Sequence, residues 1–365
     1  MRIVNTCRRN RILASLILAF VVCGMMYAKL IHALYPPVLP YFHLEVPYFE
    51  PEVKDDFPTS TSAPRIPHII HQTYKSEEIP SDFVKNVQSF VHFNRNWTYM
   101  FWTDATARQL IEARYPAFLV LWDNYRSNIN KADALRYFVL YEFGGIYADL
   151  DFECLRALDP VTRKYAAIFP LEPFEHSAFR LKIPFLLNNA IMMSRPRHPF
   201  LKFMIDNLIA FQMQLEQLDV AGPSFVTTNF VLYYKLKGND LYKLNSTPDG
   251  MLPYFYEGSM DETDENAVYV PNTHFFMNTL STSGLNEQYF TDTCLHLSPD
   301  SSTLLKRGCN ELRRRKSRDS ERQFRFTFTM HHWSETYSPS WKKVWHTYTN
   351  IRSIIPTSML QIYSE

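Results

Sequence analysis

The sequence predicts an α/β fold, a single domain built around a mostly parallel central sheet and preceded by an N-terminal transmembrane helix. Three observations support this expectation. Strand-like and helix-like segments alternate from Ile66 to Leu150, as they do when helices connect parallel strands. The chain has 365 residues, 46% hydrophobic and 21% charged, which is typical of a globular protein with a sizeable core. A separate apolar run lies near the N-terminus.

The N-terminal segment has the pattern of a signal anchor. Arginines in residues 1–11 precede an apolar run over 12–28, which continues less cleanly to residue 35. About 20 apolar residues cross a bilayer core, and positive charge tends to stay cytoplasmic. We therefore expect a cytoplasmic tail (1–11), a membrane helix (12–35) and a lumenal remainder, in a single-pass type II Golgi protein. A cleaved signal peptide is the alternative, although no small-x-small cleavage site follows the run.

Residues 36–65 have the composition of a stem. They combine repeated prolines with Thr59-Ser60-Thr61-Ser62, which favours an extended spacer. The folded domain is predicted over 66–345, followed by a C-terminal tail (346–365). Within the lumen, Asn96 and Asn245 would be N-glycosylation acceptors, because each begins an Asn-x-Ser/Thr tripeptide.

Cysteine spacing and charge add two expectations. A bridge between Cys294 and Cys309 would close a loop and leave Cys154 as a small core residue. The formal net charge of +1 gives no sign of a nucleic-acid partner, and we expect none.

The elements of the first half are separated by clear capping and turn signals. Gly144-Gly145, which tolerate left-handed backbone, should end a helix. The predicted elements are strand Ile66–Thr73, helix Ser81–Phe93, strand Trp97–Trp102, a helix from Thr103 or Asp104 to Tyr115, helix Asn130–Phe143 and strand Ile146–Leu150.

The second half is less regular. Residues 300–325 are polar and include Arg313-Arg314-Arg315-Lys316, which predicts a solvated or disordered basic loop, with a functional basic patch as the alternative. The other predicted elements are strands Ala166–Phe169, Ala190–Met193 and Phe326–Met330 and helices His198–Leu218 and Ser224–Leu236.

Two aspartates end the strand expected over Ile146–Leu150. Alternate side chains of a strand share a face, so Tyr147, Asp149 and Asp151 should face the same way. Ligands of open α/β sheets bind at the carboxyl ends of strands, and Mg²⁺ or Mn²⁺ prefers carboxylates and bridges to phosphate. The pattern predicts a divalent-metal site for a diphosphate ligand. Two solvated aspartates in a turn are the alternative, because Asp-x-Asp is common.

The preceding helix carries polar residues at helical spacing. Asn130, Asp133 and Arg136 lie on adjoining parts of one face. We expect this face to present Asp133 and Arg136 to a sugar. A surface ion pair of little energetic value is the alternative.

Together, Asn130–Tyr137 and Gly144–Asp151 closely resemble the glycosyltransferase sugar-binding region containing the DXD motif. This is glycosyltransferase family 32, which includes inositol phosphoceramide mannosyltransferases and yeast initiating α-1,6-mannosyltransferase. Ile66–Thr73 looks like the opening strand of this family, although Tyr74 replaces the usual Trp. The resemblance covers roughly Ile66–Trp341. It implies a GT-A-like fold, a retaining transfer and a divalent cation, usually Mn²⁺, with Mg²⁺ as the alternative.

The resemblance also implies roles for individual residues. Asp151 would ligate the metal, Asp149 would contact the donor and, through water, the metal, and His331 or His332 would complete the metal site. A strand-end surface position is the alternative for this His pair, and a turn is the alternative for Asn188-Asn189. No catalytic nucleophile is assigned. The implied donor-binding residues are Gln72, Asp133, Arg136, Tyr147, Asp149, Asn188, Asn189 and Trp333.

The predicted function is that of a Golgi membrane hexosyltransferase. Leu171-Glu172-Pro173 resembles the inositol phosphoceramide subgroup, which implies GDP-mannose as donor and a glycolipid or glycan acceptor. UDP-galactose or UDP-N-acetylglucosamine is the alternative donor. Two other classes are a phosphohydrolase, which Glu153 disfavours where Thr or Val is expected, and a non-catalytic lumenal protein that binds sugar nucleotides.

Overall fold

The computed structural model describes residues 26, 56–183, 185–212, 220–234, 264–281, 284–317, 324–334 and 346–363. The predicted cytoplasmic tail, nearly all of the predicted membrane helix and most of the stem lie outside these ranges, as does Asn245. Across the described ranges, no helix combines the length and the apolar character that a membrane span requires.

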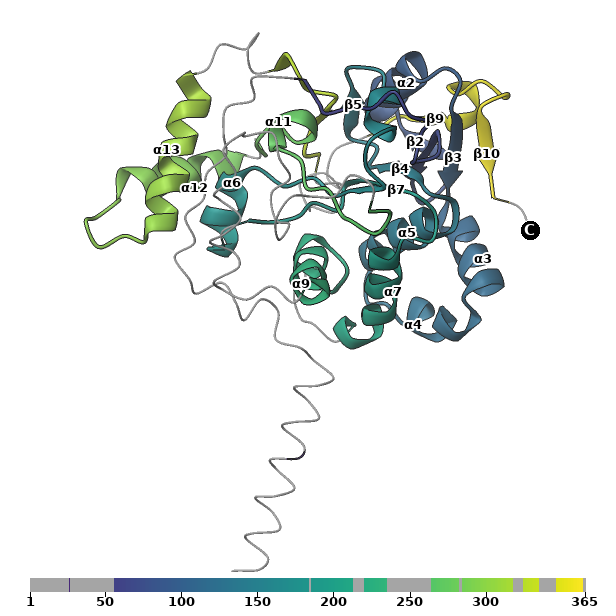
Figure 1. The fold of residues 1–365 in the computed structure, drawn as a ribbon, viewed down its shortest axis with the longest axis horizontal. Coiled ribbons are helices and arrows are strands. Elements are labelled where there is room, and N and C mark those ends of the chain that lie inside the picture. Colours follow the sequence, from purple (N-terminus) through teal and green to yellow (C-terminus); the bar gives the residue numbers. More distant parts are fainter. Residues whose placement is uncertain are drawn as a thin grey trace, which may run out of the picture.

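A six-stranded sheet forms the centre of the molecule (Figure 1). In spatial order its strands are β10 (Leu360–Ile362), β3 (Thr98–Trp102), β1 (Ile69–Thr73), β4 (Gly145–Ala148), β7 (Ile191–Ser194) and β6 (Ala167–Ile168). The first four pair in parallel, whereas β7 runs antiparallel to both β4 and β6. The prediction of a mostly parallel sheet is therefore confirmed, with one reversed strand.

Helices and loops bury both faces of this sheet. On one face, Tyr147 of β4 shares a hydrophobic core with α3 (Asp104–Arg114), α4 (Leu119–Asp123), α5 (Asn128–Phe143), α7 (Pro199–Phe211) and α9 (Pro223–Tyr233). On the other, Ile146 and Ala148 share a core with α2 (Val84–Phe93), β5 (Phe152–Cys154) and α11 (Thr273–Phe276). Because β4 is covered on both sides, all four of its residues are buried.

Smaller elements surround this centre. Two short antiparallel pairs join β2 (Glu78–Pro80) to β9 (Tyr348–Asn350), and β5 to β8 (Thr329–His331). Among the described residues, the remaining helices are α6 (Phe174–His176), α12 (Gly284–Leu295) and α13 (Thr303–Ser317). A π-helical turn covers Ser177–Leu181, and 3-10 turns cover Ser81–Phe83, Pro116–Phe118, Asp159–Thr162 and Ile351–Ser353.

Local capping explains where the helices begin. The Thr103 hydroxyl accepts from the Thr106 N–H at 3.2 Å, and Thr106 Oγ1 accepts from the Thr103 N–H at 2.9 Å, which forms a capping box. Thr103 rather than Asp104 is therefore the cap of α3. The Ser127 hydroxyl caps α5 by accepting from the Ile129 N–H at 3.2 Å. This cap starts α5 two residues before the predicted Asn130.

Gly144 and Gly145 bend the chain from α5 into β4. Both have positive φ, +65° and +101°, a region that side chains with a Cβ rarely adopt. A Cβ on Gly145 would also lie 2.5 Å from the Ile69 carbonyl oxygen. The two glycines therefore allow β4 to pair closely with β1, which places the residues that follow β4 beside the end of β1.

The predicted strand Ile146–Leu150 is too long. β4 ends at Ala148, and the Phe152 N–H donates to the Asp149 carbonyl at 3.1 Å, so the acidic pair lies in a tight turn between β4 and β5. Leu150 still packs in the core that contains Ile146 and Ala148. The expected orientation of the apolar residues is thus retained, although the aspartates are not in the strand.

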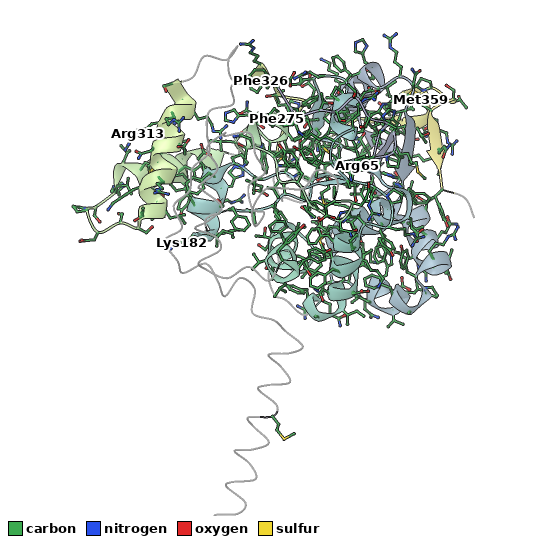
Figure 2. The ribbon with its side chains drawn as sticks, viewed as in Figure 1. Arg65, Lys182, Phe275, Arg313, Phe326 and Met359 are labelled. Carbon is green, nitrogen blue, oxygen red and sulfur yellow. A yellow bond between two sulfur atoms is a disulfide. The ribbon has the colours of Figure 1, made fainter. Side chains whose placement is uncertain are left out.

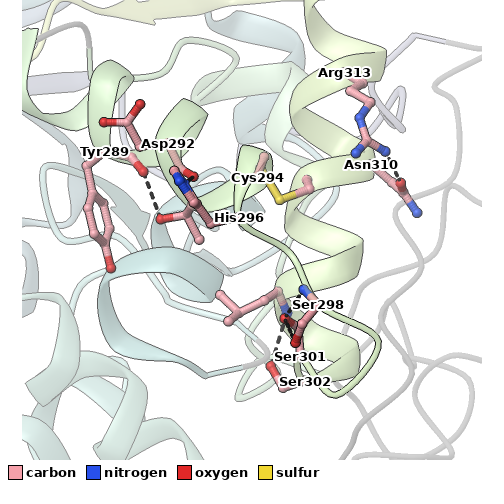
Figure 3. The surroundings of a disulfide bond; sticks show 12 residues. Tyr289, Asp292, Cys294, His296, Ser298, Ser301, Ser302, Asn310 and Arg313 are labelled. Atoms are coloured by element: carbon pink, nitrogen blue, oxygen red, sulfur yellow. Dashed lines mark hydrogen bonds between the residues drawn. A yellow bond between two sulfur atoms is a disulfide. The ribbon is translucent and has the colours of Figure 1, made fainter.

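The prediction of a basic loop over 300–325 is wrong, because residues 303–317 form helix α13. Cys309 and Leu312 are buried beside Phe179 and Phe290, and a disulfide joins Cys309 to Cys294 of α12 (Figure 3). The exposed basic residues of α13 concealed this apolar stripe in the sequence. Cys154 is free and buried, as expected.

The predicted boundaries of stem and tail also need correction. Residues 346–365 are not a separate tail, because β10 forms an edge of the central sheet and β9 pairs with β2. At the other end, Phe57 is buried among aromatic rings that include Phe275, 5.2 Å away. Figure 2 shows Met359, beside β10, and Arg313 of α13 at opposite sides of the view. The domain therefore extends beyond 66–345.

We expect Gly145→Ala to lower the free energy of unfolding by about 2 kcal/mol, because positive φ strains a residue with a Cβ and the Ile69 carbonyl leaves no space for it. Chemical denaturation followed by circular dichroism measures the effect. Gly308→Ala is the control, because Gly308 lies in a helix and its added Cβ would meet side-chain atoms, the nearest at 3.1 Å. Equal stabilities of the two variants would contradict the backbone argument.

Candidate functional site

The candidate site lies where parallel strands end. The turn Asp149–Asp151 follows β4, next to the end of β1. The first turns of α5 reach the same edge, because a helix that connects parallel strands runs back along the sheet. Strand β8 closes the turn from the other side by pairing with β5. This pairing brings Asp151 next to Ser334, which follows it by more than 180 residues in the sequence.

Arg136 is the central charge of the site. Its guanidinium lies 3.0 Å from Asp133 Oδ1 and 3.2 Å from Asp149 Oδ1, and it also donates to the Asn189 carbonyl at 2.8 Å. It lies over the Tyr147 ring, 5.0 Å from the centroid. Arg136 is 7% exposed, so its ion pair with Asp133 is not a surface ion pair. Asp133 and Asp149 both depend on Arg136 for charge compensation.

Asp149 is oriented by two neighbours. The Tyr147 hydroxyl donates to Asp149 Oδ1 at 2.7 Å, the same oxygen that Arg136 contacts. Burial raises the pKa of Asp149, and Arg136 opposes that effect. The Asp149 side chain remains 26% exposed, so part of the carboxylate faces outward and can meet a ligand.

Asp133 is buried more deeply, at 6% exposure. Burial raises its pKa from the ordinary 3.8 to about 6, while Arg136 acts in the opposite direction. Asn189 Nδ2 donates to Asp133 Oδ1 at 3.0 Å. At neutral pH Asp133 is therefore a rigid, ionised acceptor.

Asp151 and His331 form a second buried pair. His331 Nε2 lies 3.1 Å from Asp151 Oδ1, and the Ser334 N–H donates to Oδ2 at 2.8 Å. Burial alone would raise the pKa of Asp151, but His331 and these hydrogen bonds lower it below the ordinary value. Asp151 is thus held as a carboxylate at an edge where Asp149 is also negative.

The structure separates the two candidate histidines. Successive residues of a strand point to opposite faces, and β8 turns His331 toward Asp151. His332 instead lies 3.1 Å from Glu153, and both side chains are more than one-third exposed. The His332 side chain therefore lies at the surface beside Glu153, while its backbone N–H donates to the Asp151 carbonyl at 2.9 Å.

The other expected donor-binding residues lie close by but have internal partners. Gln72 Nε2 donates to the Asp149 carbonyl at 3.1 Å. Asn188 stabilises a turn, with its side-chain oxygen accepting from the Ala190 N–H at 2.6 Å and its amide donating to Glu172 at 3.1 Å. Trp333 has a positive φ of 52° and donates its indole N–H to the Thr279 carbonyl at 3.0 Å. Of the predicted Asn pair, only Asn189 contacts the charged cluster directly.

A cavity of about 260 Å³ opens at the same edge of the sheet, and its lining residues do not include Asp133, Arg136, Asp149 or Asp151. It is lined by residues at the end of β1, the start of α3 and the first two turns of α5. Sequence reasoning missed it, although its residues follow the same rule of strand ends that identified the acidic turn. Among the lining residues are Thr73, Asp104, Arg108, Asn128 and Lys131.

Asp151 and His331 have the chemistry of a partial site for a divalent cation. Two ligands about 2.1 Å from an octahedral ion are about 3.0 Å apart, close to their 3.1 Å separation. His331 Nδ1 is buried without a hydrogen-bond partner in the described part of the chain. That part holds no group of three or more His, Cys, Asp or Glu suited to a metal. The pair therefore fits a cation whose other ligands come from phosphate or water.

Residues 80–168 match the family model described as "Glycosyltransferase sugar-binding region containing DXD motif". This range contains Asp133, Arg136, Asp149 and Asp151. The predicted family resemblance is thereby confirmed, whereas His331 lies outside the matched range.

Curated relatives also match. Inositol phosphoceramide mannosyltransferase 3 from Schizosaccharomyces pombe is 37% identical over 182 residues, 48% of this chain and 48% of that protein. Mannosyl phosphorylinositol ceramide synthase SUR1 from Saccharomyces cerevisiae is 42% identical over 135 residues, 37% of this chain and 32% of that protein. A solved PaToxG glycosyltransferase has 15% identity and a TM-score of 0.37, covering 47% of this chain and 70% of that one. The chain thus spans about half or less of the length of these two curated relatives.

Replacing Arg136 should destabilise the fold. Arg136→Met leaves two buried carboxylates without charge compensation, and we expect a loss of about 3 kcal/mol or more in unfolding free energy. Arg108→Met is the matched control, because Arg108 pairs with Asp123 and Glu112 on the surface, where ion pairs contribute little. Urea denaturation compares the two, and equal losses would contradict a central role for Arg136.

The raised pKa of Asp133 leads us to expect an unusual pH dependence of stability. Its folded pKa is raised, so between about pH 4 and about pH 6 the folded protein keeps a proton that the unfolded chain releases. Stability of the wild type, relative to Asp133→Asn, should therefore fall as pH rises through that window. Thermal denaturation at several pH values measures it.

Asp123 provides a control of opposite sign. Its hydrogen bond to Arg108 lowers its pKa, so the wild type should gain stability relative to Asp123→Asn as pH rises from acid. If stability relative to each variant changed with pH in the same direction, the pKa of Asp133 would not be raised in the folded protein.

Proposed function

We propose that this chain, which carries the sugar-binding region of the DXD-containing glycosyltransferases, transfers mannose from GDP-mannose to a glycolipid acceptor of the inositol phosphoceramide type. The observation that carries the proposal is the joining of two buried charge groups at one sheet edge. Arg136 contacts both Asp133 and Asp149, and His331 of β8 contacts Asp151, which lies in the same turn as Asp149. The mixed α/β sheet supports a GT-A-like fold for the catalytic domain.

The first charge group suits the donor sugar. Carboxylates accept hydrogen bonds from hydroxyl groups, and Asp133 and the outward part of Asp149 provide two such acceptors. Arg136, Tyr147 and Asn189 hold them in place before the donor arrives. Prior orientation lowers the entropic cost of reaching the reactive geometry. The cavity at the start of α5 is the proposed position of the nucleoside, and Gln72 directly precedes Thr73 of its lining.

The second charge group suits a diphosphate. Asp151 and His331 would hold a divalent cation, Mn²⁺ by expectation or Mg²⁺, which supplies charge compensation for the leaving nucleoside diphosphate when bound. Asp151 stays ionised because its pKa is lowered. The Trp333 ring packs against the His331 ring, with the centroids 4.1 Å apart and the planes at 45°. We propose retention of configuration by same-face attack of the acceptor hydroxyl, with no protein nucleophile.

The proposal also covers the acceptor of the sugar and the location of the protein in the cell. The two curated relatives described above are named for inositol phosphoceramide mannosylation, which supports an acceptor of that class for this chain. We propose a Golgi membrane protein with a lumenal catalytic domain. Asn96 is exposed in the turn between α2 and β3, as a glycosylation site must be.

The test is transfer by the full chain, purified in detergent with Mn²⁺ and inositol phosphoceramide. The donor panel is GDP-mannose, UDP-galactose and UDP-N-acetylglucosamine. We expect mannose transfer from GDP-mannose, with loss of transfer after chelation. Transfer from a UDP-sugar alone would overturn the mannose assignment, and phosphate release without any sugar donor would favour a hydrolase.

Matched variants test whether Asp151 and His331 hold the proposed cation. Asp151→Asn and His331→Ala should reduce kcat about 100-fold or more, as loss of an electrostatic stabiliser does, while circular dichroism stays unchanged. Glu153→Gln and His332→Ala, which alter the neighbouring exposed pair, should retain most activity. Near-normal transfer by Asp151→Asn would remove Asp151 from its proposed role.

A further inference from the structure

Glu172 is a buried acidic residue outside the two charge groups of the proposed site. It lies between β6 and α6, it is 8% exposed, and its backbone N–H donates to the Leu186 carbonyl at 2.8 Å. One oxygen of its carboxylate accepts from Asn188 Nδ2 at 3.1 Å, and the other lies 3.1 Å from His176 Nδ1. Removing a carboxylate from water costs free energy that hydrogen bonds must offset, so these two partners define what Glu172 can do.

Both side-chain partners of Glu172 are fixed as hydrogen-bond donors. The Ser281 N–H donates to His176 Nε2 at 3.1 Å, so Nε2 is the acceptor nitrogen of the ring and Nδ1 carries the proton that points at Glu172. The side-chain amide of Asn188 cannot be reversed, because its oxygen accepts from the Ala190 N–H at 2.6 Å. A carboxylate, which only accepts, satisfies both donors, whereas glutamine would turn its own NH₂ group toward one of them.

The partner on one side of Glu172, Asn188, begins a bend over residues 188–190 that supports the sugar-binding cluster. The middle residue of the bend donates to Asp133 Oδ1 at 3.0 Å, and its last carbonyl accepts from the Asp149 N–H at 2.9 Å. Because Glu172 holds the first residue of the bend, it fixes the support of both carboxylates of the first charge group.

The partner on the other side, His176, supports the metal pair through Trp333. The rings of His176 and Trp333 meet nearly edge to face, with the centroids 4.5 Å apart and the planes at 79°, and Trp333 in turn packs on His331. Trp333 has a positive φ of 52°, a strained conformation that persists only where the surroundings hold it. The His176 ring, fixed by Glu172, therefore helps to hold Trp333 and the His331 ring that faces Asp151.

We propose that Glu172 is a positioning residue, whose one carboxylate fixes the metal pair through His176 and the sugar-binding cluster through Asn188. This role rests on the proposed function, because two charge groups from distant parts of the chain must keep a single relative geometry for transfer to occur. In this role Glu172 touches neither the donor nor the cation. It acts before binding, since groups already in the productive geometry need no reorganisation when the ligand arrives.

Glu172→Gln tests this role, because it keeps the shape of the side chain and leaves one donor unpaired. Transfer by the full chain at saturating GDP-mannose and Mn²⁺ measures kcat, with the corresponding UDP-sugar used if the donor panel selects it. We expect kcat to fall about 10-fold, the lower end of the effect of removing an outer partner of a metal ligand, while far-ultraviolet circular dichroism stays unchanged.

Glu142→Gln is the matched control. The Glu142 side chain is 10% exposed and, like that of Glu172, has two donors, Tyr115 at 2.6 Å and Arg197, but it lies in the last turn of α5, at the opposite end from the site. This variant should lose stability and keep its kcat. An equal fall of kcat in both variants, or a wild-type kcat in Glu172→Gln, would overturn the positioning role.

Reversing one hydrogen bond gives a rescue test. In a double variant with Glu172→Gln and Asn188→Asp, the glutamine NH₂ donates to the new carboxylate, while the glutamine oxygen still accepts from His176. We expect this double variant to regain most of the kcat that Glu172→Gln loses. A folded double variant without any recovery would overturn the inference.

His176→Ala and Asn188→Ala separate the two sides, and they test the role even if Glu172→Gln does not fold. Electron paramagnetic resonance measures the Kd of Mn²⁺ for the full chain in the presence of GDP, or of UDP if the donor panel selects it. His176→Ala should raise this Kd about 10-fold, and Asn188→Ala should leave it unchanged. An unchanged Kd in His176→Ala would contradict the role of Glu172.

The wild type separates failure of this role from failure of the proposed function. If the wild type neither binds Mn²⁺ with the nucleotide nor transfers a sugar, the proposed function itself fails. Normal wild-type binding and transfer, with unaffected variants, would reject Glu172 alone.

Discussion

The contact of Arg136 with Asp133 and Asp149 is the interaction on which the site depends. Three ionised groups are removed from most of the surrounding water, and each would be strongly unfavourable there alone. Together they satisfy one another, and Asn189 and Tyr147 complete their hydrogen bonds. The desolvation of these charges costs so much free energy that well-packed apolar residues would often stabilise the fold equally well or better. The proposed function accounts for this cost, because a ligand rich in hydroxyl groups would bind the paired carboxylates.

Backbone geometry brings this cluster together. Asp133 and Arg136 belong to α5, whereas Asp149 follows β4, so the turn between helix and strand sets their separation. Gly144 and Gly145 make that turn without a loop, and β4 enters the sheet directly against β1. Packing on both faces of β4 then holds the acidic turn still. The Asp151 and His331 pair depends on a second constraint, the pairing of β5 with β8.

Much of the first half of the fold could be predicted because its signals are local. Alternating apolar strands, hydroxyl caps and a glycine pair act within a few residues, and the observed elements agree with them to within a few positions. The failures share a different cause. The basic helix α13 forms because its buried stripe packs on Phe179 and Phe290, and β10 forms because β3 offers an open edge. Neither partner is visible from the segment itself.

The sequence by itself determined the chemistry of this protein: which acidic, basic and aromatic residues are available, and their spacing on α5 and after β4. Tertiary structure alone decided which of two adjacent histidines contacts Asp151 and that Asn189 rather than Asn188 supports Asp133. The physical reason is range. Helical spacing and strand alternation act over a few residues, whereas burial and charge compensation depend on groups that the folded chain brings together from far apart.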